Sequence, residues 1–188
     1  MRILEIGINQ GGSVLMWLNY FGPNCMYYGV DINPECKKLE KINDKKNVQI
    51  FIGDQADQTF LAYLITQIPK VDVIIDDGGH WMEQQINSLD ILFPHLVDNG
   101  IYLCEDTHTS YYPGFGGGLR NPKSFIEYSK SIVDSLHGMH PWTVPEDNWT
   151  KYCDSICFYD SIAVLQKREQ RIKPSCITIG KRLLSDKE

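Results

Sequence analysis

Short apolar runs alternate along this chain with segments whose apolar residues recur at helical spacing. The runs are rich in β-branched residues and almost continuously apolar, which is typical of strands buried on both faces of a parallel sheet. They lie at 2–7, 26–32, 48–54, 71–76 and 100–106. Helices are predicted at 13–21, 34–42, 57–68, 81–96 and 122–139. This alternation predicts an open α/β sheet with right-handed crossovers.

The last third of the chain follows a different pattern. Residues 155–167 predict an antiparallel hairpin that turns at Tyr159–Asp160. Residues 175–184 either extend the sheet edge or lie outside it. Two irregular zones, 107–121 and 139–154, follow a strand or a long helix, so both could hang over one rim of the sheet.

Size and charge narrow the class of protein. A chain of 188 residues with 43% hydrophobic content fits one domain over 1–188, with little or nothing before the first strand. Its net charge of −6 argues against a nucleic-acid partner, because phosphate backbones attract positive surfaces. No stretch approaches 18 continuous apolar residues and no signal peptide is evident, so we expect a cytoplasmic protein without membrane contact and with reduced cysteines.

The first strand is followed by a glycine-containing turn, in the stretch "LEIGINQGGS". In open α/β sheets, ligands bind beyond the carboxyl ends of the strands. Gly7 and Gly11 could let a ligand approach the backbone closely, or could simply serve a tight turn. Asn9 replaces the second glycine of the dinucleotide motif, and the Lys-Ser/Thr pair of a P-loop is missing.

The second and third strand ends carry acids that suit a nucleoside. Asp31 could accept both hydroxyls of a ribose, although it also lies just before a helix that Pro34 would begin. Asp54 or Gln55 could meet the amino group of an adenine, while Asp57 has the simpler role of a helix N-cap. Taken in order, these strand ends predict a nucleoside site.

Two acidic clusters follow the fourth and fifth strands, in "IIDDGGHW" and "CEDTH". Asp77, Glu105 and Asp106 would repel one another if they met, unless a hard cation such as Mg²⁺ neutralised them. The alternative is that these acids cap helices or face water. Because Mg²⁺ prefers oxygen ligands, His80 is better assigned as a general base, with His108 as the second candidate.

The stretches "LEIGINQGGSVLMW", "YGVDINPECK", "IIDDGGHW", "EDTHTSYYPGFGGGLR" and "FYDSIAVLQK" together resemble one family. They are similar to class I S-adenosylmethionine-dependent methyltransferases, most of all to the metal-dependent macrolide sugar O-methyltransferases (mycinamicin and macrocin type). Cephalosporin hydroxylase and rhamnosyl O-methyltransferase proteins share the pattern. The resemblance covers roughly residues 2–167. It implies a Rossmann-like, doubly wound, seven-stranded sheet in three α/β/α layers, mostly parallel with a C-terminal antiparallel hairpin.

The resemblance also implies roles for particular residues. S-adenosylmethionine would lie over the first three strand ends, and the residues expected to bind it are Glu5, Gly7, Asn9, Gly11, Ser13, Asp31, Asp54, Gln55 and Asp76. Mg²⁺ would be held by Asp77, Glu105 and Asp106, and Thr109, Tyr111 and Tyr112 would belong to a substrate loop. Family members usually carry a helix or domain before the first strand. The 139–154 zone, with Trp142 and Trp149, either replaces part of such a lid or is a surface loop anchored by its tryptophans.

The leading hypothesis is therefore an enzyme that uses Mg²⁺ to assist transfer of a methyl group to a hydroxyl of a sugar or glycosylated natural product. The expected partner is a small-molecule acceptor, and homo-oligomer formation stays open. The alternatives are an oxidative enzyme like cephalosporin hydroxylase, or a non-catalytic nucleoside-binding subunit of the same fold. An iron oxygenase would need two histidines and one carboxylate, whereas this site offers one well-placed histidine.

Overall fold

A computed structural model of the chain describes residues 1–42, 47–140, 144–175, 177 and 180. Its seven strands form one sheet in the order β3-β2-β1-β4-β5-β7-β6. The strands are β1 (Arg2–Ile6), β2 (Met26–Asp31), β3 (Val48–Ile52), β4 (Val71–Asp76), β5 (Leu96–Cys104), β6 (Cys153–Tyr159) and β7 (Ile162–Lys167). The first five pair in parallel, and β7 is antiparallel to both β5 and β6. The predicted seven-stranded sheet with an antiparallel final pair is confirmed.

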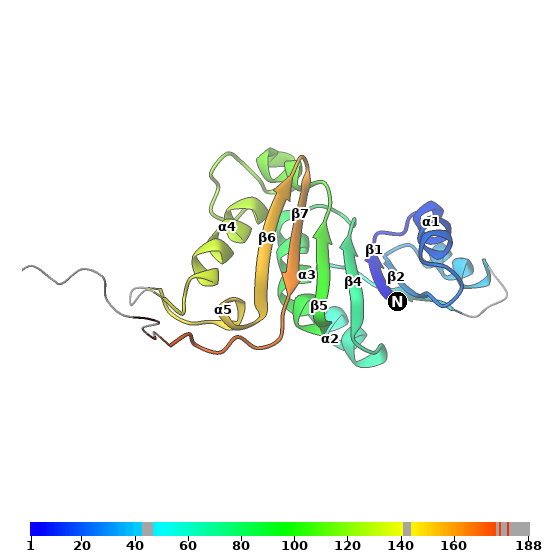
Figure 1. Cartoon of the computed structure of the whole chain (residues 1–188). Coiled ribbons are helices and arrows are strands. Elements are labelled where there is room, and N and C mark those ends of the chain that lie inside the picture. Colours follow the sequence, from blue (N-terminus) through cyan, green and yellow to red (C-terminus); the bar gives the residue numbers. More distant parts are fainter. Residues whose placement is uncertain (43–46, 141–143, 176, 178–179, 181–188) are drawn as a thin grey trace, which may run out of the picture.

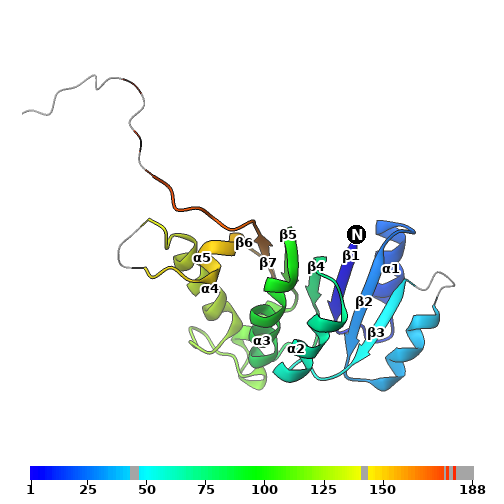
Figure 2. The same cartoon turned by 90° about the horizontal axis from the view of Figure 1, so that it is seen from below.

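The helices are α1 (Gly12–Phe21), α2 (Gln58–Gln67), α3 (Met82–Leu92), α4 (Phe125–Leu136) and α5 (Asn148–Tyr152), with 3-10 turns η1 (Pro34–Lys41), η2 (Phe93–His95), η3 (Thr107–Tyr111) and η4 (Pro113–Phe115). Helices α2, α3 and α4 pack on one face of the sheet, and α1 packs on the other (Figure 1, Figure 2). Among the described residues, no helix combines the length and apolarity that crossing a membrane requires.

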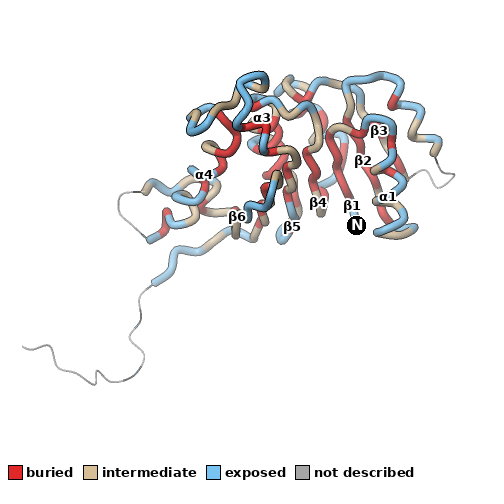
Figure 3. Tube along the Cα trace, turned by 90° about the horizontal axis from the view of Figure 1, so that it is seen from above, coloured by how far each residue is buried: buried red, intermediate tan, exposed pale blue. Residues whose placement is uncertain are grey.

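Two apolar clusters lie on the two faces of the sheet. The larger packs under α2, α3 and α4 and includes Leu4, Leu89 and Tyr102. The smaller packs under α1 and η1 and includes Ile3, Val14 and other buried side chains. Burial is therefore densest along the middle strands, whose side chains are covered from both sides (Figure 3). This double coverage explains why the predicted strands read as continuous apolar runs.

Several predicted boundaries move for local reasons. The 34–42 segment is a 3-10 helix, and the predicted 81–96 helix ends at Leu92, one turn before β5 begins at Leu96. Pro94 lacks a backbone N–H, so an α-helix cannot run through this position without losing a hydrogen bond. The hairpin turns at 160–161, one residue later than predicted, where Ser161 has a left-handed backbone with φ 62°.

Of the two interpretations of the 139–154 zone, a partial lid or a loop anchored by its tryptophans, Trp149 fits the second. Its ring lies 4.9 Å from the ring of Phe93, centroid to centroid, and packs on the larger apolar cluster. Helix α5 carries this side chain at the end of the sheet opposite the carboxyl ends of the parallel strands (Figure 1). Trp142 lies outside the described residues, as does most of 176–188.

Candidate active site

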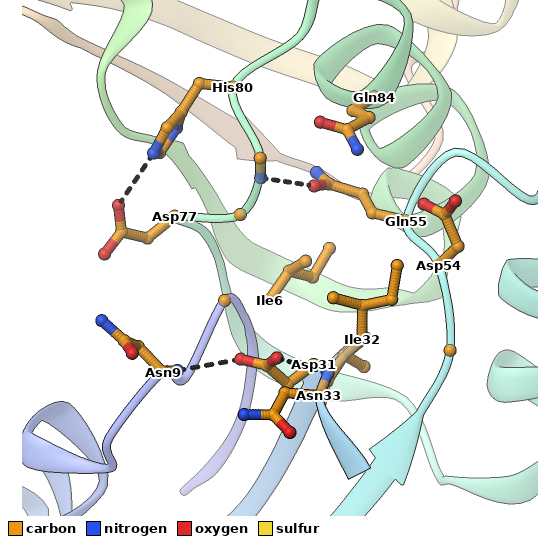
Figure 4. A pocket seen from close by; sticks show the side chains of 15 residues that line it. Ile6, Asn9, Asp31, Ile32, Asn33, Asp54, Gln55, Asp77, His80 and Gln84 are labelled. Carbon is orange, nitrogen blue, oxygen red and sulfur yellow. Dashed lines mark hydrogen bonds and ion pairs between the residues drawn. The ribbon is translucent and has the colours of Figure 1, made fainter. Parts of the chain in front are cut away.

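A cavity of about 440 Å³ opens at the carboxyl ends of the parallel strands (Figure 4). Its wall comes from the segments that follow β1, β2, β3 and β4, as expected for an open α/β sheet. Its lining residues are Ile6, Gly7, Asn9, Val30, Asp31, Ile32, Asn33, Gly53, Asp54, Gln55, Asp77, Gly78, Gly79, His80 and Gln84. The cavity volume falls within the range of small-molecule sites in proteins.

Gly7 brings the ends of β1 and β4 together. Its backbone is left-handed, with φ 85°, and a Cβ atom there would lie 2.0 Å from the carbonyl oxygen of Asp77. The Asp77 N–H in turn donates to the carbonyl oxygen of Ile6 at 3.0 Å. Close backbone approach therefore does require this glycine, but the approaching atoms belong to the turn after β4. That turn carries Asp77 into the cavity wall.

Asp31 presents a fixed carboxylate at the end of β2. Oδ2 accepts a hydrogen bond from the Asn9 N–H at 2.9 Å, and Oδ1 accepts one from the Asn33 N–H at 2.8 Å. A carboxylate oxygen can accept about two hydrogen bonds, so each oxygen keeps one free acceptor position. The two oxygens can therefore serve two neighbouring hydroxyls, while the backbone holds the group in place.

The two polar side chains after β3, Asp54 and Gln55, are not equally available to a ligand. Both polar atoms of the Gln55 side-chain amide are hydrogen-bonded. Nε2 donates to Asp76 at 2.5 Å and to Ser88 at 2.9 Å, and Oε1 accepts from the Gly79 N–H at 3.1 Å. Gln55 is also only 5% exposed. Asp54 is exposed on the cavity wall, and its Oδ1 accepts from the Ala56 N–H at 2.8 Å. Of these two side chains, Asp54 is therefore the more available to a ligand.

Four residues of the predicted cofactor set lie outside the cavity lining. They are Glu5, Gly11, Ser13 and Asp76. Glu5 is buried on the α1 side of the sheet and accepts a hydrogen bond from the Tyr27 hydroxyl. Gly11 precedes α1 with a left-handed backbone, φ 80°, and lies against the Leu39 side chain, which would have to shift to admit a Cβ. Glu5 and Gly11 therefore pack behind the cavity wall and do not line it.

Asp76 is enclosed by the protein and accepts hydrogen bonds from Gln55 and from the Tyr102 hydroxyl. Burial raises the pKa of its carboxyl to about 7, while these two hydrogen bonds act in the opposite direction. Gln55 thus ties this acid to Gly79 in the turn after β4. Asp76 positions that turn from behind.

Two carboxylates and one imidazole meet beside the cavity. Asp77, His80 and Asp106 each offer a ligand atom, and these atoms all lie within 4.8 Å of one another. His80 Nε2 lies 3.5 Å from Asp106 Oδ2 and 3.9 Å from Asp77 Oδ1. The His80 Nδ1 atom is buried and has no hydrogen-bond partner. The fourth and fifth strand ends therefore do converge, as the order of the sheet requires.

Backbone strain marks the same place. His80 has φ 59° and Asp106 has φ 52°, both in the left-handed region that non-glycine residues seldom adopt. Thr109 lies between them, with its Oγ1 3.0 Å from the His80 carbonyl oxygen and 2.8 Å from that of Asp106. Thr109 is 3% exposed, so it holds the two turns together from below the surface.

Two acids at these strand ends, Asp77 and Glu105, have raised pKa values. Burial raises the pKa of the Asp77 carboxyl and Asp106 adds to the rise, while His80 lowers it. Burial also raises the pKa of Glu105, with further contributions from Asp77 and Asp106. Glu105 nevertheless stays outside the compact group of three ligand atoms. A cation at this position would favour the charged carboxylates against both burial and their mutual repulsion.

His108 lies on the outer side of the cluster. Its Nδ1 is 2.6 Å from the Ser161 hydroxyl oxygen and 3.8 Å from Asp106 Oδ1. Its ring meets the edge of the Tyr112 ring, with centroids 5.4 Å apart. Tyr111, the last residue of η3, and Tyr112, which follows it, are both about half exposed. The predicted substrate loop thus presents two tyrosines outward, whereas Thr109 faces inward.

Sequence reasoning did not select Asn33, Gln84 or Ser161. Asn33 carries one of the N–H groups that fix Asp31, and Gln84 lines the cavity while its Oε1 accepts from the Trp81 N–H at 3.3 Å. The capping position of Gln84 at the start of α3 was visible in "HWMEQ". Ser161 reaches His108 only because β7 pairs with β5, which no local motif reveals.

Comparison with known proteins identifies the family. A methyltransferase domain model matches residues 4–107. L-olivosyl-oleandolide 3-O-methyltransferase of Streptomyces antibioticus is 36% identical over 148 residues, covering 73% of this chain and 37% of the relative. Demethylmacrocin O-methyltransferase of Streptomyces fradiae is 34% identical over 183 residues, covering 89% and 44%. This chain therefore spans less than half the length of these relatives.

A solved structure agrees with the sequence relatives. The MycE methyltransferase from the mycinamycin biosynthetic pathway, in complex with Mg, SAH and mycinamycin VI, superposes with a TM-score of 0.80 at 28% identity. The match covers 89% of this chain and 44% of that one. The chain belongs to the class I S-adenosylmethionine-dependent methyltransferases, in the group that includes these macrolide sugar O-methyltransferases.

Proposed function

We propose that this protein transfers a methyl group from S-adenosylmethionine to a hydroxyl of a sugar or glycosylated natural product, assisted by Mg²⁺. One observation carries the proposal: Asp77 and His80 line the cavity that presents Asp31, and both belong to the group that Asp106 completes. A donor site and an acid–histidine cluster thus share one wall. The named relatives and the Mg and SAH complex of MycE support the same reaction class.

The donor's nucleoside would lie over the ends of β1, β2 and β3. Asp31 keeps one acceptor position on each oxygen for the two ribose hydroxyls. Ile6 and Ile32 give the cavity an apolar part, and Asp54 stands where an adenine amino group could donate to it. The backbone of Gly7, Asn9 and Gly79, which line the cavity, would lie next to the donor.

The residues of the cluster fit a hard divalent cation. Asp77 and Asp106 supply oxygen atoms within one small space, and Glu105 adds a third carboxylate close by. Mg²⁺ bound there would act as a Lewis acid and lower the pKa of a sugar hydroxyl. The two-carboxylate, one-histidine composition does not match the two histidines and one carboxylate typical of iron oxygenases.

His80 is placed to accept the proton that the acceptor hydroxyl must lose. Its Nε2 faces the two carboxylates, and its side chain is one-fifth exposed, so an acceptor can reach it. The acceptor oxygen must then approach the donor methyl carbon in line, at about 3 Å. His108 is nearly half exposed and hydrogen-bonds Ser161, so it is the second candidate for this proton.

The test is a methyl-transfer assay with S-adenosylmethionine and a panel of deoxysugar glycosides. We expect turnover that stops in excess EDTA and returns when Mg²⁺ is restored. Full turnover in EDTA would contradict the role of the metal but not that of the donor. Calorimetry with S-adenosylhomocysteine tests the donor site separately, and the absence of binding would overturn the proposal.

A further inference from the structure

Helix α3 buries a polar side chain in the middle of its apolar stripe. Met82, Leu89 and Leu92 belong to the larger apolar cluster and recur along α3 at the spacing of helical turns. Gln85 occupies the remaining position of this stripe and is 0% exposed. A buried polar side chain costs stability unless its hydrogen bonds are made, so the partners of Gln85 indicate what it does.

The Gln85 side-chain amide is only half satisfied. Its Nε2 donates to the Glu105 carbonyl oxygen at 3.0 Å, just after β5. Within the described part of the chain, its Oε1 is buried and has no hydrogen-bond partner. A methionine or leucine would fill the same position without an unpaired acceptor. The bond to Glu105 is therefore the contact that an apolar side chain could not make.

This carbonyl oxygen belongs to the peptide group that joins Glu105 to Asp106. The N–H of Glu105 donates to the Asp76 carbonyl oxygen at 2.9 Å, so β4 and α3 hold Glu105 from its two sides. Because a peptide group is planar, fixing its carbonyl also fixes the N–H of Asp106. Asp106 then adopts a left-handed backbone with φ 52°, a conformation that persists only when the surrounding structure supports it.

The Asp106 carboxylate depends on this backbone for its direction. Its side chain is 48% exposed, and its pairing partners among the described residues are His80 at 3.5 Å and His108 at 3.8 Å, both beyond ordinary hydrogen-bond length. The Asp106 carbonyl oxygen accepts from the Thr109 hydroxyl at 2.8 Å. Gln85 and Thr109 thus hold the two peptide groups that flank Asp106, one from α3 and one from η3.

We propose that Gln85 is a positioning residue of the metal site. Its amide holds the Glu105–Asp106 peptide in the orientation that directs the Asp106 carboxylate toward Asp77, so that both can bind one cation. Groups that orient metal ligands from outside contribute to metal affinity. This inference rests on the proposed function, because it requires that the cluster bind Mg²⁺. It adds a buried residue that does not line the cavity.

Binding of Mn²⁺, a paramagnetic substitute for Mg²⁺, can be followed on the full chain by electron paramagnetic resonance without turnover. Gln85→Met keeps the length of the side chain and removes the bond to Glu105. We expect its Kd for Mn²⁺ to rise by about tenfold, the lower end of what outer partners of metal ligands contribute. Binding of S-adenosylhomocysteine, measured without metal, should stay unchanged, because Asp31 and Asp54 lie at other strand ends.

Stability separates this role from a general loss of packing. Gln85→Met removes the unpaired Oε1 and leaves the Glu105 carbonyl oxygen with the weak Cys104 thiol donor at 3.7 Å. One unpaired acceptor thus replaces another, so the Tm of the metal-free protein should change little. Ser129→Ala is the matched control, since Ser129 is also 0% exposed and its hydroxyl donates to the Phe125 carbonyl oxygen at 2.8 Å. Whatever its effect on Tm, it should leave the affinity for Mn²⁺ unchanged.

Equal affinity for Mn²⁺ in wild type and Gln85→Met would overturn this inference and leave the metal site itself standing. An equal loss in Ser129→Ala would assign the effect to packing and overturn the inference as well. A wild type that binds no Mn²⁺ would overturn both the inference and the role of the metal in the proposed function. If Gln85→Met does not fold by circular dichroism, Gln85→Leu replaces it, with the same expected rise in Kd.

Discussion

His80 and Asp106 face each other from two strained turns, with Nε2 and Oδ2 3.5 Å apart. If His80 takes the acceptor's proton, His80→Ala should lower kcat by about 10²- to 10⁴-fold, the usual contribution of a general base. Binding of S-adenosylhomocysteine should change little, because in the proposed function Asp31, and not His80, binds the donor's ribose. Turnover and calorimetry on the same preparation separate the two effects.

His108→Ala is the matched variant for this prediction. We expect a smaller loss, since His108 lies 3.8 Å from Asp106 Oδ1 and is held by Ser161 rather than by the cavity wall. If His108→Ala loses the larger part of turnover and His80→Ala stays near normal, the assignment of the base is reversed.

Asp76 makes stability depend on pH in a predictable direction. Its folded-state pKa of about 7 lies above the ordinary value of 3.8, so the folded protein holds a proton that the unfolded chain has released. The free energy of unfolding should therefore fall as pH rises from about 4 to 7. One pKa unit is worth about 1.4 kcal/mol, which sets an upper limit of about 4 kcal/mol for this residue.

Denaturant unfolding in EDTA at several pH values measures the effect. Asp76→Asn keeps the side-chain shape without the charge, so its stability should vary less with pH than that of wild type. Burial lowers the pKa of His95, so this residue makes stability rise with pH. Its contribution is the same in wild type and in Asp76→Asn and cancels in the comparison. Parallel pH profiles for the two proteins would show that Asp76 does not carry the dependence.

At the scale of elements, the turn between β1 and α1 tests how the scaffold builds the site. Gly7→Ala should destabilise the fold by more than about 3 kcal/mol, because its Cβ would lie 2.0 Å from a carbonyl oxygen in a left-handed backbone. Gly116→Ala is the control: Gly116 has a left-handed backbone with φ 78° and ψ 8°, and a Cβ there would meet only the Met82 side chain, at an ordinary contact distance of 3.8 Å. It should cost only the left-handed penalty, about 1 kcal/mol. Equal losses in thermal unfolding would contradict the clash.

The sequence predicted the elements well, since the middle strands are buried on both faces and their apolar runs therefore stand out. The sequence also predicted that Asp77 and Asp106 lie at the ends of neighbouring strands, because the order of the strands in the sheet follows from the fold class. It could not show that Gln55 would turn inward to bind Asp76, or that Trp149 would pack on Phe93. Such choices depend on long-range packing, in which the same residue type serves either a ligand or the core.

At the scale of the whole molecule, ligand binding should be visible as stability. A donor that spans the ends of β1, β2 and β3 binds only the folded chain, so S-adenosylhomocysteine at 100 times its Kd should add about 2.7 kcal/mol to the free energy of unfolding. For a chain of this size that gain corresponds to a rise in Tm of roughly 5–11 °C.

Variants of Asp31 and Asp54 test whether the rise in Tm comes from a ligand bound at these strand ends. Asp31→Ala should abolish most of the rise in Tm, because both ribose acceptor oxygens are lost, while Asp54→Ala should weaken it less. Asp31 itself accepts hydrogen bonds from the backbone of Asn9 and Asn33, so the variant's Tm without ligand must be measured too. A full ligand-induced rise in Asp31→Ala would mean that the nucleoside lies elsewhere on the rim.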